Sequence, residues 1–413
     1  MPRIAWIRFR FAPVLPLAVV VAALGCRDDA ESPTGPELGP ALSTSATQAL
    51  SFRQISAGKF HSCGVTTDNL AYCWGQDASG ELGDGTHPAN GSSSTPIPVS
   101  GGLHFLQVSA GNYYSCGVTT DERAYCWGEN FYGKLGDGTN TPRLTPVAVI
   151  GGHRFRQVDT GDYHTCAVTP SDEAFCWGYN HYGQLGDGST FNQRRRPVRV
   201  AGGLTFRRVI AGALHTCGVT TGFRAYCWGD GRDGQIGDGK TYTRWTPRLV
   251  TGGLSFRQVH AGYTHRPGGA HSCGVTTDNR AYCWGGNDQG QLGDGTSIQR
   301  LKPVAVAGGL QFNGVSPSEE HTCGVTTGSR AYCWGWSYYG VLGDGSQLGD
   351  GPARLSPVAV VGGISFSAVS AGPGHTCGVT TGNAGYCWGQ NNAGQLGDGS
   401  QTTTSTPVAV AAP

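Results

Sequence analysis

Fourteen of the fifteen cysteines fall into seven pairs with nine residues between partners, the clearest chemical pattern in the chain. In a β-hairpin with a three-residue loop, two such cysteines lie directly opposite each other and can form a disulfide. Zinc would need a further ligand in every unit, and none recurs, while the Cys-x-x-Cys pattern of redox catalysts is absent. We therefore expect seven disulfides: Cys63–Cys73, Cys116–Cys126, Cys166–Cys176, Cys217–Cys227, Cys273–Cys283, Cys323–Cys333 and Cys377–Cys387.

Two other repeated residue types could bind metal ions. A histidine stands two positions before the first cysteine in six units, and a tyrosine, Tyr114, replaces it in the second: His61, His164, His215, His271, His321 and His375. Because tyrosine is accepted there, we interpret this position as a structural hydrogen bond to a neighbouring loop. Each unit also carries one aspartate in a Gly-Asp-Gly turn, whereas calcium loops gather several oxygen ligands. The sequence predicts no metal site and no cofactor.

The cysteine pairs belong to a repeat of about 50 residues that occurs seven times. Each repeat reads as four short strands, typified by FRQVSAG, HTCGVTT, RAYCWG and TPVAV, with alternating apolar positions and glycine-rich turns. Four strands per repeat predict an all-β fold, a seven-bladed β-propeller over residues 49–413 with one disulfide per blade. The recurring tryptophan of CWG should pack between blades. If the TPVAV strand completes the following blade, the last such strand closes the ring on the first blade.

The repeats SAGxxHTCGVTT…YCWGxNxxGQLGDG resemble those of the regulator of chromosome condensation family over residues 49–413. The resemblance implies a seven-bladed propeller. The exported bacterial members of the β-lactamase inhibitor protein II type are similar in setting. This chain differs by having two cysteines in each blade.

The N-terminal residues 1–25 read as a signal peptide, with Arg3, Arg8 and Arg10 before an apolar stretch that is short for a membrane span. The stretch ends in Ala-Leu-Gly-Cys26, which is similar to a bacterial lipoprotein signal, so Cys26 is the expected lipidation site. The alternatives are simple cleavage after Gly25 and an uncleaved membrane anchor. Residues 26–48 are rich in Pro, Ser and Thr and read as a flexible tether. We expect an extracytoplasmic protein at the outer membrane or cell surface, and otherwise a secreted one.

Charge and composition narrow the choice of partner. The formal net charge is +1 and charged residues make up 14% of the chain, so no strong field attracts nucleic acid. We expect a monomer that touches the membrane only through its N-terminal lipid.

Residues that differ between blades are the candidates for recognition, because shared positions build the scaffold. Adjacent carboxylates, Glu319 and Glu320, are unique to the sixth repeat and are expected at the surface. Exposed aromatic residues on the loops of a rigid scaffold are typical anchors of interfaces. The candidate binding residues are Phe60, Tyr113, Phe131, Tyr132, Tyr163, Tyr179, Tyr182, Trp336, Tyr338 and Tyr339. The competing interpretation is that these side chains only cover the rim of the propeller.

The function predicted from these features is a non-enzymatic scaffold that binds a protein or an envelope polymer through loops on one face. A glycan-active or cell-wall enzyme is the first alternative, and it would need two carboxylates facing each other across the central funnel. Guanine-nucleotide exchange, which the family resemblance implies, is the second, and the export signal argues against it.

Overall fold

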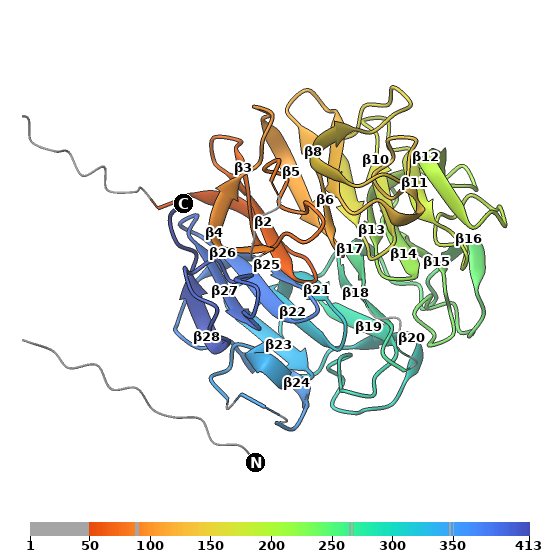
Figure 1. The fold of residues 1–413 in the computed structure, drawn as a ribbon. Coiled ribbons are helices and arrows are strands. Elements are labelled where there is room, and N and C mark those ends of the chain that lie inside the picture. The colour runs from red at the N-terminus through yellow and green to blue at the C-terminus, as the bar shows by residue number, and fades with distance from the viewer. Residues whose placement is uncertain (1–48, 87–90, 264–265, 267, 347, 350) are drawn as a thin grey trace, which may run out of the picture. The chain divides into compact units, whose positions relative to one another are not determined.

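A computed structural model describes residues 49–86, 91–263, 266, 268–346, 348–349 and 351–413. In these residues, strands form seven four-stranded antiparallel sheets, and the four strands of each sheet are consecutive in the chain (Figure 1). The sheets are the blades of a β-propeller, numbered one to seven here in chain order, which confirms the predicted fold. The predicted signal peptide, Cys26 and the tether lie outside the described residues. No helix in the described part of the chain is long and apolar enough to cross a membrane.

The first strand of each blade lines the central channel, and the next three follow outward. The first strands are β1 (Phe52–Ala57), β5 (Phe105–Ala110), β9 (Gln157–Thr160), β13 (Phe206–Ala211), β17 (Phe256–Ala261), β21 (Phe312–Pro317) and β25 (Phe366–Ala371). The second strands are β2 (His61–Thr66), β6 (Tyr114–Thr119), β10 (His164–Val168), β14 (His215–Thr220), β18 (His271–Thr276), β22 (His321–Thr326) and β26 (His375–Thr380).

The third strands are β3 (Ala71–Gln76), β7 (Ala124–Gly128), β11 (Ala174–Tyr179), β15 (Ala225–Gly229), β19 (Ala281–Gly285), β23 (Ala331–Gly335) and β27 (Gly385–Gly389). The outermost strands are β4 (Ser92–Pro98), β8 (Arg143–Ala148), β12 (Gln193–Arg199), β16 (Arg244–Leu249), β20 (Arg300–Ala305), β24 (Arg354–Ala359) and β28 (Thr404–Ala409). Two short 3₁₀ turns, η1 (Phe131–Gly133) and η2 (Tyr338–Gly340), follow β7 and β23.

The ring does not close by exchange of a strand, so that prediction is wrong. The TPVAV strand of each repeat pairs with the third strand of its own blade, and β28 pairs with β27. Blades one and seven meet by packing, with Phe52 and Trp74 in one apolar cluster with Cys377 and Leu396. Figure 1 shows these blades, red and blue, side by side. The seam between the chain ends is therefore built like the other six.

The seven predicted disulfides are all present, each between the second and third strands of a blade. Cys63 lies directly opposite Cys73, in register with Ser62 opposite Trp74, and the other blades repeat this register. All fourteen half-cystines are buried and belong to the apolar clusters between blades. The disulfides are thus part of the packed seams as well as crosslinks within a blade.

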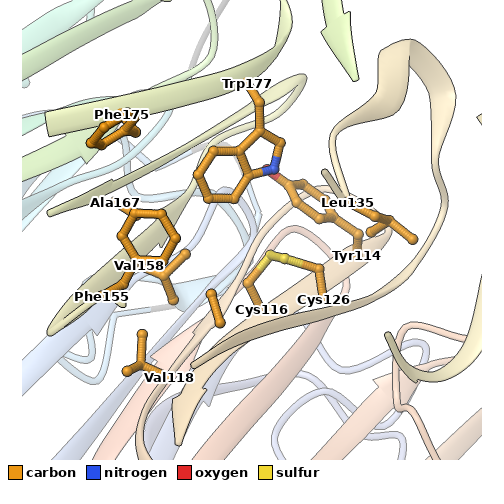
Figure 2. Packing of buried hydrophobic residues seen from close by; sticks show 11 residues of the cluster. Tyr114, Cys116, Val118, Cys126, Leu135, Phe155, Val158, Ala167, Phe175 and Trp177 are labelled. Carbon is orange, nitrogen blue, oxygen red and sulfur yellow. A yellow bond between two sulfur atoms is a disulfide. The ribbon is translucent and has the colours of Figure 1, made fainter. Parts of the chain in front are cut away.

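Each recurring tryptophan of the repeat fills a seam between two blades, as expected. Trp177 of blade three packs beside Leu135 and the Cys116–Cys126 disulfide of blade two (Figure 2). Its indole nitrogen donates a hydrogen bond of 2.9 Å to the carbonyl oxygen of Lys134 in the preceding blade. A Cβ added to Gly136 would lie 2.7 Å from the indole nitrogen, so glycine is required where the ring approaches the loop.

The repeated histidine bonds to a strand of the next blade, where a neighbouring loop was expected. His164 Nε2 lies 2.7 Å from the hydroxyl oxygen of Thr216, which donates to the carbonyl oxygen of Gln184. The other histidines meet a serine or threonine at the same position, and in blade two the Tyr114 hydroxyl reaches Thr165 at 3.0 Å. The Ser or Thr hydroxyl links the histidine of one blade to the loop carbonyl that also accepts the tryptophan bond.

Glycines after the inner strands allow adjacent backbones to touch. The amide of Asp162 donates to the carbonyl oxygen of Gly212 at 3.3 Å, and that of Ala213 donates to Gly262 at 3.2 Å. A Cβ on Gly161 would lie 2.0 Å from the oxygen of Gly212. Glycine is therefore favoured after the inner strand, because the backbones of adjacent blades approach each other closely at the channel mouth.

The outermost strands carry proline in every blade, for example Pro146 in β8 and Pro197 in β12. A proline has no amide hydrogen, so it interrupts the row of donors that an exposed sheet edge presents. This placement discourages pairing with an edge strand of another chain.

Gly161→Ala should destabilise the protein by about 1–3 kcal/mol, because the new methyl group would overlap the carbonyl of Gly212. Gly222→Ala is the matched control, since the nearest atom to its added Cβ is 3.9 Å away, and its effect should stay within about 0.5 kcal/mol. Chemical denaturation measures both. Equal stability of the two variants would contradict this account of the inner ring.

Acid should weaken the protein because the six seam histidines are buried and neutral. Burial lowers their pKa values from 6.5 to about 3, or about 4 for His215. The unfolded chain therefore takes up protons below about pH 6.5 that the folded chain does not, so stability is lost as the pH falls towards 3.

His164→Tyr, which copies Tyr114 of blade two, should remove up to about 1.4 kcal/mol per pH unit of this dependence. Urea unfolding of both proteins at about pH 7.5 and about pH 5 measures the difference. Burial raises the pKa values of Glu81 and Asp159 to about 7, which acts in the opposite direction but cancels between the two proteins. An unchanged pH dependence would contradict the assignment of His164 as a neutral seam residue.

Candidate functional site

Two sets of loops share one end of the propeller, which we call the loop face. The first set joins the first and second strands of each blade, and the second set joins the third and fourth. Their backbones are hydrogen-bonded: the amide of Glu129 donates to Tyr113, and that of Tyr179 donates to Tyr163. The predicted aromatic residues occupy both sets, so the expectation that the variable loops lie on one face holds.

The longer loops are held by side chains that repeat. Asn130 accepts a hydrogen bond from the amide of Leu135 and donates to Asp137. Asp137 also accepts from Thr139 and forms an ion pair of 2.7 Å with Arg143. Four further loops repeat this aspartate–arginine pair. These carboxylates serve the turn and the arginine, and the described residues contain no group of three or more His, Cys, Asp or Glu that could hold a metal ion.

Four of the predicted aromatic residues come together on blades two and three. The rings of Tyr132 and Tyr179 are 4.5 Å apart between centroids, and Tyr163 lies 6.1 Å from Tyr132. Tyr182 contacts the edge of Tyr179, and the guanidinium of Arg232 in blade four lies over the Tyr182 ring. We call Tyr132, Tyr163, Tyr179 and Tyr182 the tyrosine cluster. Tyr132 is 40% exposed and the other three rings are half-buried, so the cluster presents aromatic surface to solvent.

The remaining candidates form two smaller groups and one isolated residue. Phe60 and Tyr113 contact each other across blades one and two, with centroids 5.5 Å apart. Trp336, Tyr338 and Tyr339 pack together on blade six, and Trp336 stacks on Tyr338. Phe131 is exposed and has no aromatic partner among the described residues. The structure therefore groups nine of the ten candidates, and whether they bind a partner stays a prediction.

Backbone strain coincides with three of these aromatic residues. Tyr113, Tyr132 and Tyr339 have φ values of 60°, 65° and 59°, in the left-handed region that glycine prefers. The other described non-glycine residues with positive φ all lie in the hairpin turns between the second and third strands. Residues with a strained backbone conformation are concentrated at the functional sites of proteins.

The left-handed conformation of Tyr132 and Tyr339 has a cause elsewhere in the repeat, two residues further along the chain. In blades three, four, five and seven, the Gln of the Gly-Gln-Leu/Ile-Gly sequence accepts a hydrogen bond from the amide two residues earlier, as Gln184 does from Tyr182. Lys134 and Val341 replace this glutamine in blades two and six and provide no such acceptor. There the chain forms η1 and η2 instead, with Tyr132 and Tyr339 in the left-handed conformation.

Lys134 is itself buried beneath the loop face. Its ammonium lies 2.6 Å from Glu129 and donates to the carbonyl oxygen of Asn112 at 2.8 Å. The ammonium also lies 4.5 Å from the centre of the Tyr114 ring. This ion pair stands between the loops that carry Tyr113 and Tyr163 and fixes their spacing.

Charged residues surround the channel mouth on the same face. Glu320, expected at the surface, is buried and forms an ion pair of 3.1 Å with Arg266, so that expectation is wrong. Burial raises the pKa of the neighbouring Glu319, against the opposing effect of Lys59. The side chain of Tyr263 lies at this end of the channel, and its hydroxyl donates to the carbonyl oxygen of Thr160 in blade three at 3.2 Å.

The fold and the loop face together define a propeller of the class that presents variable loops on a rigid ring. The chain matches the RCC1-like domain over residues 21–345, and regulator of chromosome condensation (RCC1) repeats over residues 366–395 and 386–413. It therefore belongs to the RCC1-like family.

Relatives share the repeat over large parts of the chain. The ultraviolet-B receptor UVR8 of Arabidopsis thaliana is 31% identical over 64% of this chain, and human E3 ubiquitin-protein ligase HERC2 is 30% identical over 87%. The matched regions span 48% of UVR8 and 6% of HERC2. Among solved structures, human WBSCR16 has a TM-score of 0.72 at 20% identity, covering 83% of this chain and 94% of that chain. Prp20p from Saccharomyces cerevisiae has a TM-score of 0.71 at 19% identity, covering 84% and 87%.

Proposed function

We propose that this protein is an extracytoplasmic binding scaffold that recognises a partner protein through the aromatic residues of the loop face. The observation that carries the proposal is the tyrosine cluster, which holds partly exposed rings on two blades around the strained backbone of Tyr132. Aromatic side chains with a polar end, such as tyrosine, are enriched at the centres of protein interfaces.

The scaffold supports such a role because it fixes the loops before a partner arrives. Seven disulfides and the ion pair between buried Lys134 and half-buried Glu129 limit the movement of the elements that carry the rings. Preorganised loops lose less conformational entropy on binding. Within the same fold, Prp20p is a protein described with its binding properties to Gsp1p and histones, which is consistent with a propeller that binds proteins.

A triple variant tests the tyrosine cluster with residues that other blades carry at the same positions. Tyr163→Ala copies Ala270, Tyr179→Gln copies Gln76, and Tyr182→Ala copies Ala393. The full chain is immobilised and exposed to an envelope extract of the source cell, and bound proteins are quantified by mass spectrometry. Because aromatic interface anchors commonly contribute about 2 kcal/mol or more, the variant should lose at least about tenfold of the specific partner.

Phe223→Ser is the matched control, because Phe223 lies in a hairpin turn at the opposite end and Ser329 occupies the equivalent position with a similar φ. The control should capture the partner as the wild type does. Equal capture by the triple variant would refute the tyrosine cluster as the binding surface. If the wild type instead retains carbohydrate or lipid from an extract whose proteins have been completely digested, and the triple variant does not, a protein partner is refuted in favour of an envelope polymer.

The location outside the cytoplasm rests on the seven disulfides and on the N-terminal sequence that ends at Cys26. Protein isolated from its own cells under thiol-blocking conditions should show no free thiol among the fourteen paired cysteines. Metabolic labelling with a fatty acid should modify the wild type but not Cys26→Ser. Reduced thiols in a cytoplasmic fraction would refute export, and an unlabelled but exported wild type would refute lipidation alone.

A further inference from the structure

A cavity of about 570 Å³ occupies the central channel, between the inner strands of all seven blades. Its size falls within the range of small-molecule sites in proteins. Gln54 and Ser56 of β1 and the residues at the equivalent positions of the other inner strands supply most of its polar lining. Its chemistry can therefore be read blade by blade at two equivalent positions.

In most blades these two residues have a structural task. The side-chain amide of Gln54 donates to the carbonyl oxygen of Val108 in the next blade at 2.8 Å, and Gln107, Gln157 and Gln258 repeat the bond. The hydroxyl of Ser56 accepts from the amide of Ala110, and three further serines of the inner strands form similar bonds to the next blade. Glutamine and serine at these positions join neighbouring inner strands.

Blades three to five break this pattern at adjacent places. Blades six and seven also lack the glutamine and carry Gly314 and Ala368 there, but only blades three to five place ionisable side chains at these positions. Asp159 replaces the serine of blade three, Arg208 replaces the glutamine of blade four, and His260 replaces the serine of blade five. Asp159 still accepts the amide of Ala211 through one oxygen, at 2.9 Å. His260 faces Pro317 of the next blade at the position where other blades offer an amide, and proline has none. The structural bond is therefore impossible at His260.

Arg208 and Asp159 share this part of the cavity without a direct contact. Arg208 is exposed although it lines the channel, and no ion pair joins it to Asp159 among the described residues. Burial raises the pKa of the Asp159 carboxyl to about 7, while Arg208 acts in the opposite direction. Burial, and then Arg208, lowers the pKa of His260, so its imidazole is neutral. His260 Nε2 lies 2.8 Å from the side-chain nitrogen Nε2 of Gln258. Tyr263 lines the cavity at the end of the channel that faces the loops.

We propose that the channel binds a small zwitterion of the amino-acid class, with its carboxylate on the Arg208 guanidinium and its ammonium on the Asp159 carboxylate. A guanidinium offers two parallel donors to a carboxylate, which fixes the orientation of the ligand. The free oxygen of Asp159 accepts from the ammonium group. His260 and Gln258 supply further polar contacts beside the two charged groups. The inference is independent of the loop face and of its proposed partner.

The test is calorimetric titration of the full-length protein with each of the twenty common amino acids. For each amino acid that binds, the matching carboxylic acid without the amine and the matching amine without the carboxylate are titrated as well. We expect saturable one-to-one binding of at least one amino acid, and at least about tenfold weaker binding of either half. A carboxylic acid that binds as tightly as its amino acid would refute the zwitterion site, as would the absence of binding at about 10 mM of every amino acid.

Two variants return the channel to the pattern of the other blades and should leave the fold intact. Arg208→Gln restores the glutamine found at this position in four blades, and Asp159→Ser restores the serine that bonds the next blade. Each should weaken binding at least about tenfold. Arg207→Gln is the control, because Arg207 lies over Phe223 and does not line the cavity. Unchanged affinity in Arg208→Gln and Asp159→Ser, with melting temperatures like the wild type, would refute the site.

Discussion

One backbone carbonyl in each blade organises the seam to the next blade. The oxygen of Gln184, for example, accepts hydrogen bonds from the indole of Trp228 and the hydroxyl of Thr216. The Thr216 hydroxyl also bonds His164 of the preceding blade, and the Trp228 indole packs on the Cys166–Cys176 disulfide and Gly186 of that blade. The tryptophan, the Ser or Thr, the histidine and the cysteines recur together because they are parts of one contact that is repeated around the ring.

This contact leaves one position free to vary. The acceptor is a backbone oxygen, so the side chain of the same residue is not needed, and the seven blades use Glu81, Lys134, Val341 and four glutamines there. Variation at that residue alters the loop beside it without weakening the seam. In blades two and six the exchange produces the 3₁₀ turns that carry Tyr132 and Tyr339. An exchange that leaves the hydrogen bonds of the seam in place thus reshapes the surface.

Local signals in the repeat were sufficient to predict the strands, the disulfides and the number of blades. The register of Cys63 with Cys73 follows from the hairpin loop, and the intervals between copies define the blades. The sequence does not show which blade the TPVAV strand joins, because its alternation of apolar and polar residues suits its own blade and the following blade equally. The antiparallel pairing of β28 with β27 decides this.

The candidate site was predictable only in part, for a related reason. Aromatic residues in loops stand out against small residues in the other blades, so the sequence singles out Tyr132 and Tyr182 as candidates. Asp159, Arg208 and His260 were missed because they lie in strands that otherwise repeat closely, and a single exchange in each looks like scatter. They become visible when the bonds of Gln54 and Ser56 show what the scaffold requires there.

Because every blade is a continuous stretch of chain, the ring has no unique starting point. Blades one and seven meet through the same Trp74, Ser62 and His375 contacts that join any other pair. A gene rearranged to begin at another blade boundary would encode the same seams, with the original termini joined by a short linker. Tandem duplication of one repeat can likewise add a blade without rethreading a strand.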